Sequence, residues 1–221
     1  MAVKLLFCGV ERTGKSTTTS KIKDGLVFSF DSKVYPFKTP SKDINEYHGM
    51  SWLEDTMNDT ISAYKERYGS LPKTIVMDTV TQLYNMIAKF SMDKFSGFDI
   101  HSNINKETLA FNSYIEDVLI ANGVNVVIVA HTLYDSDTYR YIIPATGNFA
   151  KTGSWLSIVD NSSFVHIKNG SKFVIEHTNM KFPCRTTLED IPDSQPIEEY
   201  DINEHIYKLS KVHTENEEFK F

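Results

Sequence analysis

The feature that most constrains this chain is a glycine-framed loop close to its amino terminus. Residues 9–16 read GVERTGKS, which fits the phosphate-loop pattern without a mismatch. An apolar run, residues 4–9, leads into the loop, and a helix-compatible stretch, KSTTTSKI, follows it. Because this loop works between a buried strand and a helix, the motif predicts an α/β fold that binds a nucleotide.

Each residue type in the loop has a part in holding phosphates. Glycines 9 and 14 let the backbone approach an anion closely, so that successive amides and the next helix point at the β-phosphate. Lys15 can span the β- and γ-phosphates, and the Ser16 hydroxyl can ligate Mg²⁺. ATP and Mg²⁺ are therefore the expected ligands. The predicted nucleotide-binding residues are Gly9, Val10, Glu11, Arg12, Thr13, Gly14, Lys15, Ser16 and Thr17.

Apolar runs alternate with helical patterns over the first 134 residues. The runs that predict buried strands are residues 4–9, 25–31, 73–78 and 124–132. The patterns that predict amphipathic helices are residues 51–68, 80–87 and 106–121, the last with Leu109, Ile115, Val118 and Leu119 facing inward. Residues 91–105 read as a polar loop. This alternation predicts a mostly parallel sheet with helices on both faces.

The pattern changes after Tyr134. Short apolar segments separated by turns follow, and Asn169-Gly170 between two of them is a strong hairpin signal. The last of these segments, NMKFPCR, also reads as a short strand. We therefore predict a sheet that ends in antiparallel strands, within a nucleotide-binding domain of residues 1–188.

Residues 189–221 form a segment of different composition. They carry ten acidic residues against three lysines, whereas the rest of the chain is close to neutral. We expect an acidic tail, poorly packed or an isolated helix. Such a tail is commonly just solvated, and the alternative is that it docks on a basic protein partner or competes with nucleic acid.

Composition also bears on the compartment. No apolar run approaches the length of a membrane span, so no membrane partner is expected. The two cysteines, Cys8 and Cys184, lie far apart without metal-ligand spacing. A reduced, cytoplasmic protein is the expectation that follows.

Polar residues stand where three of the predicted strands end. Asp78 ends TIVMD, Asp31 ends LVFSFD, and His131 follows VVIVA. In open α/β sheets ligands bind at this carboxyl edge, and a phosphate loop needs a carboxylate for the magnesium shell. Asp78 is therefore the second candidate magnesium residue, through water, beside Ser16. His131 could sense the γ-phosphate or orient the attacking water, although either aspartate could instead cap a helix and the histidine could be structural.

Taken in order, these stretches resemble a known family. GVERTGKSTT, a strand ending in aspartate, IVMDTVTQL and VVIVAHT are similar to the RecA-like ATPase core, over roughly residues 3–188. The closest likeness is to phage RecA-like nucleotide-binding proteins of single-strand annealing and recombination, where a histidine stands at the position of His131. The resemblance implies a ring or filament of identical subunits, located in the host cytoplasm if the source is a phage.

The resemblance also implies roles for particular residues. The candidate catalytic residues are Lys15, Asp78, His131, Asp31 and Glu11. NMKFPCRTTL resembles the segment that carries basic residues toward a neighbouring subunit's nucleotide, which makes Lys181 and Arg185 candidate trans-acting contacts.

One departure from the family pattern concerns the rate of hydrolysis. In RecA-like proteins the second strand ends in an acidic cluster whose glutamate polarises the attacking water. Here the segment reads FDSKVY, so Lys33 stands about where that glutamate would be. Because a lost general base typically costs roughly a hundred- to ten-thousand-fold in rate, we predict weak intrinsic hydrolysis unless Asp31 or Glu11 takes the role.

Two loops combine aromatic and basic residues as single-strand binding requires. The chain has no basic excess, so a large electrostatic footprint for nucleic acid is absent. Stacking of bases on aromatics beside a few cations needs less charge. The candidate DNA-binding residues are Tyr134, Tyr139, Arg140 and Tyr141 in one loop and Lys94, Phe95 and Phe98 in the other. The alternative is that these are ordinary hairpin and lid aromatics.

Two further classes of function stay open. A nucleoside or nucleotide kinase also begins with such a loop, but its usual arginine-rich lid is missing, since the chain has four arginines and no close pair. A nucleotide-gated binding or assembly protein, in which ATP sets the conformation and hydrolysis is incidental, is compatible with Lys33.

Overall fold

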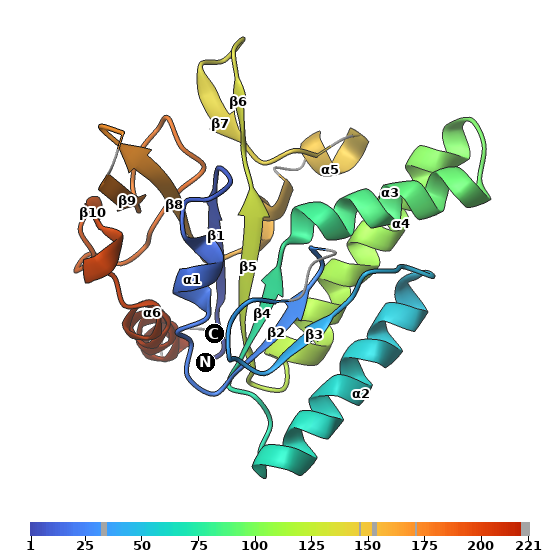
Figure 1. Cartoon of the computed structure of the whole chain (residues 1–221), viewed down its shortest axis with the longest axis horizontal. Helices are drawn as coiled ribbons and strands as arrows, with labels where there is room; N and C mark the ends of the chain where they lie inside the picture. The colour runs from blue at the N-terminus through green and yellow to red at the C-terminus, as the bar shows by residue number, and fades with distance from the viewer. Residues whose placement is uncertain (32–34, 146, 152–153, 171, 218–221) are drawn as a thin grey trace.

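The structure is a computed structural model, which describes residues 1–31, 35–145, 147–151, 154–170 and 172–217. At its centre lies an eight-stranded sheet with the order β10-β9-β8-β1-β5-β4-β2-β3 (Figure 1). Its strands are β1 (Lys4–Gly9), β2 (Gly25–Ser29), β3 (Ser41–Asp43), β4 (Thr74–Asp78), β5 (Asn125–His131), β8 (Asn161–Lys168), β9 (Lys172–Glu176) and β10 (Ser194–Pro196). Two further strands, β6 (Leu133–Asp135) and β7 (Arg140–Ile142), form a separate hairpin.

The sheet confirms the predicted mixture of strand directions. The strands from β8 to β3 all run parallel to their neighbours. β9 and β10 are antiparallel and close one edge. The β8–β9 turn contains Asn169-Gly170, as predicted from that dipeptide. β1, β2, β4 and β5 are almost wholly buried, which explains their continuous apolar sequences.

Helices cover both faces of the sheet. They are α1 (Lys15–Thr19), α2 (Met50–Tyr68), α3 (Val80–Lys94), α4 (Phe98–Tyr114), α5 (Gly147–Lys151) and α6 (Ile202–Glu217). Short helices of other types cover Ile115–Ile120, Ser154–Ile158 and Ile197–Glu199. One apolar core lies between the sheet and α2, α3 and α4, and a second lies on the opposite face, where α6 packs. None of the described helices has both the length and the apolarity needed to cross a membrane.

Three local predictions are wrong. The helix expected from residue 106 begins at Phe98, so much of the expected polar loop is helical. Leu109, expected to face inward, is 62% exposed, because Thr108, Phe111 and Ile115 set the inward stripe one position away. The segment NMKFPCR makes only isolated bridges, such as Asn179 with Cys184, and no strand.

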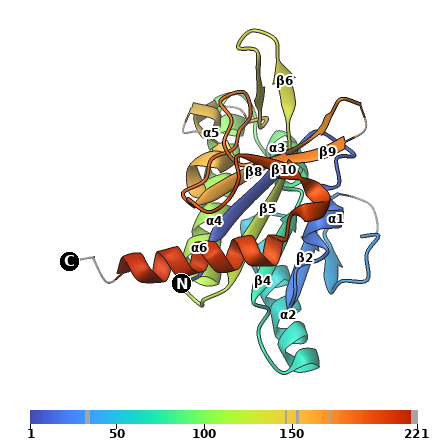
Figure 2. The ribbon, with the colours of Figure 1, turned by 90° about the vertical axis from the view of Figure 1, so that its left-hand side faces the viewer.

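The carboxyl-terminal segment is packed against the body, which corrects the expectation of a loose tail. β10 extends the sheet, and α6 buries Ile202, His205, Ile206 and Leu209. Figure 2 shows α6 crossing the body beside the amino terminus, where the Met1 amino group donates to Thr214 Oγ1 at 2.8 Å. The sequence signal for this packing is the amphipathic spacing of 202, 206 and 209, which the acidic composition hid. The division at residue 188 into two units stays a prediction.

A buried polar network fastens α6 to the sheet. His177, which follows β9, lies 2.9 Å from Ser163 Oγ, and His205 on α6 lies 2.8 Å from the Tyr200 hydroxyl. Burial lowers the pKa of His177 to about 4 and that of His205 to about 3. Both histidines are therefore neutral at pH 7, which lets them be buried without a charged partner.

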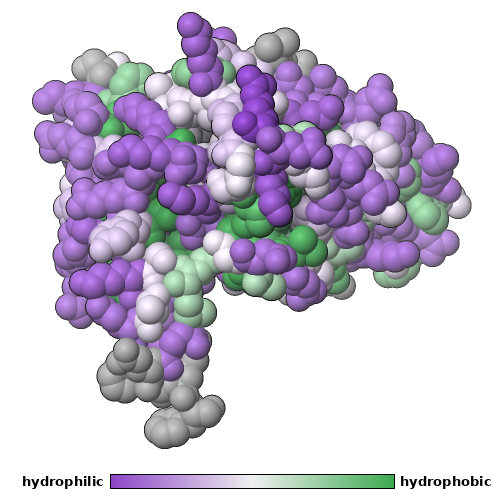
Figure 3. All heavy atoms as spheres, turned by 90° about the horizontal axis from the view of Figure 1, so that it is seen from below, coloured by the Kyte–Doolittle hydropathy of each residue, from purple (hydrophilic) through white to green (hydrophobic). Residues whose placement is uncertain are grey.

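The lower face of the molecule is mostly polar. Seen from below, toward the edge where the parallel strands begin, hydrophilic side chains cover most of the surface and an apolar area lies near the middle (Figure 3). The chemistry-bearing strand ends lie at the opposite edge of the sheet.

Candidate nucleotide-binding site

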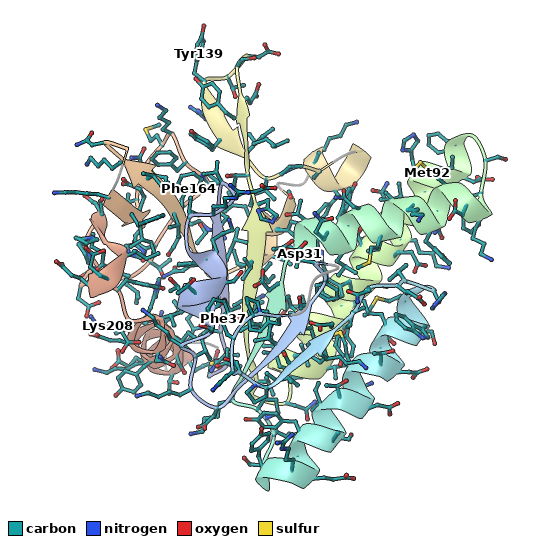
Figure 4. The ribbon with its side chains drawn as sticks, viewed as in Figure 1. Asp31, Phe37, Met92, Tyr139, Phe164 and Lys208 are labelled. Carbon is teal, nitrogen blue, oxygen red and sulfur yellow. The ribbon has the colours of Figure 1, made fainter. Side chains whose placement is uncertain are left out.

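The carboxyl ends of four parallel strands meet at one cavity of about 570 Å³. Its wall includes residues 11–17 of the loop after β1, Asp31 after β2, Asp78 at the end of β4 and His131 at the end of β5. Figure 4 labels Asp31 near the end of β2 and Phe37 in the segment that follows. The structure thus brings together all five predicted catalytic candidates, which are spread over residues 11–131 of the sequence.

The backbone of the loop explains its two glycines. Gly14 has a φ of +89°, a left-handed conformation that costs a glycine little. A Cβ on Gly9 would lie 2.2 Å from the carbonyl oxygen of Val165 on the adjacent strand β8, so no side chain fits there. The loop can therefore leave β1 only because both positions lack a side chain.

Lys15 is held under the loop by the loop's own backbone. Its ammonium donates to the carbonyl oxygens of Gly9 at 3.0 Å and Val10 at 2.6 Å. Burial lowers its pKa to about 8, and the charges of Asp78 and Glu11 act in the opposite direction. At pH 7 the ammonium is mostly protonated, and it shares the cavity with Arg12 and with the carboxylates of Glu11, Asp31 and Asp78, which suits it to bind a phosphate.

The residues at the end of β4 fit a magnesium ion. Burial raises the pKa of Asp78, while a hydrogen bond from Ser16 and the charge of Lys15 lower it. The next residue, Thr79, has a buried Oγ1 without a hydrogen-bond partner in the described part of the chain. A carboxylate, a hydroxyl on the loop and an unpaired buried hydroxyl supply oxygen ligands of the kind Mg²⁺ and its waters prefer.

His131 connects the cavity to α3. Its backbone amide donates to Thr81 Oγ1 at 2.9 Å, and its side chain forms part of the cavity wall. Thr81 lies in the first turn of α3, directly after Thr79 and Val80. A change at His131 can therefore be transmitted to the start of this helix.

Two carboxylates remain as candidates for a general base. Asp31 is half-buried in the cavity wall and raises the pKa of Asp78 by its charge. Glu11 lies on the exposed side of the loop. Lys33, which the family pattern replaces by a glutamate, lies outside the described residues.

Sequence reasoning missed an aromatic edge of the cavity. Tyr35 and Phe37 lie in its wall with their ring centroids 5.5 Å apart, and the Tyr35 hydroxyl is 3.4 Å from the Ser16 carbonyl oxygen. Burial raises the pKa of Tyr35 to about 12, so it stays protonated and donates this bond. The two aromatic residues in VYPF, directly after a strand-end aspartate, were the available signal.

The predicted trans-acting residues lie away from this cavity. The Arg185 guanidinium donates to the carbonyl oxygen of Val159 at 2.6 Å within its own chain. Lys181 is exposed and contributes to a different cavity beneath the β6–β7 hairpin. Their action on a neighbouring subunit stays a prediction.

The predicted DNA-binding residues form two separate projections. Tyr139 is 72% exposed at the end of the β6–β7 hairpin, and Tyr134 and Arg140 are also exposed there. Tyr141 instead packs 5.1 Å from Phe164, ring centroid to ring centroid. The second projection is the turn between α3 and α4, which carries Lys94, Phe95 and Phe98. Figure 4 shows Tyr139 and, beside the second projection, Met92 well apart.

The sheet order, the phosphate loop and the strand-end carboxylates together define a P-loop nucleoside triphosphatase. A family model described as an AAA domain matches residues 1–179. The chain therefore belongs to the AAA-domain family of P-loop ATPases. No curated protein matches it.

Proposed function

We propose that this AAA-family protein binds ATP with Mg²⁺, hydrolyses it slowly, and assists DNA recombination or single-strand annealing as an oligomer. The observation that carries the nucleotide chemistry is the meeting of Lys15, Ser16, Asp78 and His131 at one cavity. The DNA and assembly parts rest on the resemblance to phage RecA-like proteins and on the exposed aromatic projections.

Each residue of the cavity has a definite task in this proposal. The loop amides and Lys15 bind the β- and γ-phosphates, and Ser16 and Asp78, the latter through water, hold Mg²⁺. When bound, Mg²⁺ neutralises charge on the phosphates. His131 contacts the γ-phosphate or the attacking water and reports its presence to α3 through Thr81.

Slow turnover follows from the weak general base. Asp31 is the better placed of the two candidate carboxylates because it lies half-buried in the cavity wall, whereas Glu11 is exposed. Neither carboxylate occupies the position of the water-polarising glutamate in the RecA-like pattern, so hydrolysis depends on positioning and charge stabilisation rather than on proton abstraction.

The β6–β7 hairpin is the proposed contact for single-stranded DNA. Tyr134 and Tyr139 present exposed rings, and Arg140 supplies a cation beside them. Rings and cations together bind bases and phosphates without sequence preference. Repetition of the hairpin along an oligomer would offset the small charge of one subunit, and the exposed carboxylates of residues 189–201 are available to a basic protein partner.

ATP turnover measured with and without single-stranded DNA, beside the mass of the protein with and without ATP, tests this function. We expect slow turnover that DNA stimulates, a rise in mass with ATP, and loss of nucleotide binding in Lys15→Ala. Turnover of several per second by the protein alone would contradict the weak-base argument.

Other outcomes would favour the other classes of function. Phosphate transfer to a nucleoside acceptor would identify a kinase. Tight ATP binding without turnover under any condition would identify a nucleotide-gated assembly protein. Unchanged affinity in Lys15→Ala would overturn the assignment of the cavity itself.

A further inference from the structure

Two exposed apolar surfaces are unused by the ATPase site. One is a groove of about 670 Å³ beneath the β6–β7 hairpin. The other, which we call the tip, consists of Met92, Phe95 and Phe98 at the turn between α3 and α4. Apolar surface left exposed and gathered in one place marks interaction sites on soluble proteins.

The groove has an aliphatic lining. Leu133 and Ile142 of the hairpin and Met180 of the segment after β9 contribute to it, and Met180 is 87% exposed. Pro144 and Pro183 also line it. The aromatic rings that line the groove are already packed. Tyr141 and Phe182 lie 5.5 Å apart, and Tyr84 stacks on Phe149 at 5.8 Å, so they offer little free face for a base. Apolar side chains of a protein suit this lining better than nucleic acid does.

The tip presents its apolar side chains to solvent. Phe98 is 83% exposed and Met92 is 58% exposed, which is unusual for large apolar side chains on a helical turn. Phe98 begins α4 directly after Gly97, so the ring stands at the very end of the helical pair. In Figure 1 this pair projects from the body, away from the sheet.

We propose that the tip of one subunit docks in the groove of a second copy of this chain. Charge supports this occupant. Among the described residues that line the groove, the charged ones are Arg140 and Lys181, both cationic. Within residues 92–99, the turn that bears the tip, the carboxylates of Asp93 and Asp99 stand against the ammonium of Lys94. When the two surfaces dock, the cationic groups beside the apolar groove therefore meet the net acidic surroundings of the apolar tip.

The contact joins different surfaces of the two subunits, and it leaves one free tip and one free groove at the ends of any pair. Head-to-tail contacts of this kind build rings or filaments rather than closed dimers. This inference rests on the oligomer of the proposed function and specifies the surfaces that form it.

The same helix connects the contact to the nucleotide. Thr79 and Gln82, at the start of α3, line the nucleotide cavity, whereas Thr81 and Asn85 line the groove. The tip lies at the other end of α3, about 22 Å away at 1.5 Å per residue. Docking of a neighbour in the groove therefore touches the helical turn that His131 also contacts.

Single substitutions at exposed positions test the two surfaces separately. Phe98→Asp in the tip and Met180→Asp in the groove should each weaken self-association about tenfold or more, as loss of an interface anchor does. Leu109→Asp is the control, because Leu109 is also exposed on α4, at 62%, but belongs to neither surface. Sedimentation at several concentrations, with ATP and Mg²⁺, measures the association, and a thermal melt verifies that each variant folds.

Mixing the two variants tests the head-to-tail arrangement. The Phe98→Asp subunit keeps its groove and the Met180→Asp subunit keeps its tip, so the mixture should form one-to-one dimers and nothing larger. Neither variant alone should do so. A mixture that stays monomeric, while the unaltered chain assembles, would overturn the proposed contact.

The remaining outcomes also decide the matter. Unchanged assembly of Phe98→Asp would overturn the role of the tip. If Met180→Asp assembles normally but loses affinity for single-stranded DNA, the groove binds nucleic acid and the proposal is wrong. An unaltered chain that stays monomeric yet shows DNA-stimulated ATP turnover would overturn the contact while leaving the ATPase function intact.

Discussion

The phosphate loop and the β6–β7 hairpin follow neighbouring strands of one sheet but are held in opposite ways. β1 and β5 pair along their whole length, and the loop leaves the first while the hairpin leaves the second. Lys15 and Thr13 in the loop are buried, whereas Leu133, Tyr134 and Tyr139 in the hairpin are exposed. A site that must bind phosphates with fixed geometry is enclosed, and a site suited to contact other macromolecules is left in solvent.

The carboxyl-terminal segment accounts for much of this difference. The Asn203 side chain accepts from the Lys23 amide at 2.9 Å and donates to the Lys21 carbonyl oxygen at 3.1 Å, just after α1. The Tyr200 ring stacks on Phe7 of β1 with centroids 5.8 Å apart. The strand, the loop and the helix that bind phosphate are thus braced from outside, whereas the hairpin is held at Tyr141, which packs on Phe164 and Phe182, and its outer residues are exposed.

The largest effect is expected for Gly9→Ala. The added Cβ would lie 2.2 Å from the Val165 carbonyl oxygen, and neither paired strand can move away freely. We expect the free energy of unfolding to fall by about 4 kcal/mol or more, together with nucleotide binding. Urea unfolding and titration with an ATP analogue measure the two losses.

Gly123→Ala provides the control for backbone strain alone. Gly123 also has a positive φ, of +78°, but a Cβ there would meet nothing within 4 Å. Gly123→Ala should lower the free energy of unfolding by about 1 kcal/mol and leave the nucleotide affinity unchanged. Equal losses of unfolding free energy in Gly9→Ala and Gly123→Ala would show that the loop is not confined by β8.

Tyr200→Ala removes the brace without touching the cavity. Loss of a fully packed aromatic side chain should lower the free energy of unfolding by about 3 kcal/mol. Because Ile197, three residues earlier, lies against the loop at Gly14, ATP affinity should fall as well, even at a temperature where the variant is fully folded. Tyr207→Ala on the exposed face of α6 should leave the free energy of unfolding and the ATP affinity unchanged. Similar losses in Tyr207→Ala would show that Tyr200 does not brace the loop.

Low pH should first destabilise the packing of α6 on the sheet. His177 and His205 have pKa values lowered by burial to about 4 and about 3, below the ordinary value of about 6.5. The unfolded chain therefore binds more protons between pH 6.5 and 4, and stability falls as the pH drops through this window. At pH 5 the loss is about 2 kcal/mol for each histidine. Urea unfolding at pH 7 and pH 5 should show this difference reduced by about half in His177→Gln, and an unaltered difference would contradict it.

The sequence predicted the enclosed phosphate loop better than the exposed β6–β7 hairpin. Buried parallel strands need continuous apolar runs, so residues 4–9 and 74–78 were recognisable, and the polar end of the second predicted that Asp78 would lie at the sheet edge, where it lines the cavity. Local rules sufficed because the loop between strand and helix has its own glycine and lysine pattern.

What could not be predicted depends on contacts between distant segments. The acidic composition after residue 188 gave no sign that Tyr200 would stack on Phe7, since such packing is fixed only in the folded chain. No sequence pattern predicted that Tyr35 would lie in the cavity wall. Leu109 satisfied the helical spacing of its neighbours but fell on the wrong side of the stripe, because a helix phase is set by its strongest apolar positions, here Phe111 and Ile115.

The smallest effect on folding is expected at the hairpin. Tyr139 is 72% exposed, so Tyr139→Ala should change the free energy of unfolding by less than about 0.5 kcal/mol. Affinity for single-stranded DNA should nevertheless fall by about 1 kcal/mol or more, because a stacking face is lost. Fluorescence anisotropy with a labelled oligonucleotide measures this, and Tyr139→Phe, which keeps the ring, should bind like the unaltered chain. If Tyr139→Ala binds DNA normally, the exposed hairpin serves something other than DNA. Docking of a neighbouring subunit alone would then have to explain why the hairpin is exposed while the phosphate loop is enclosed.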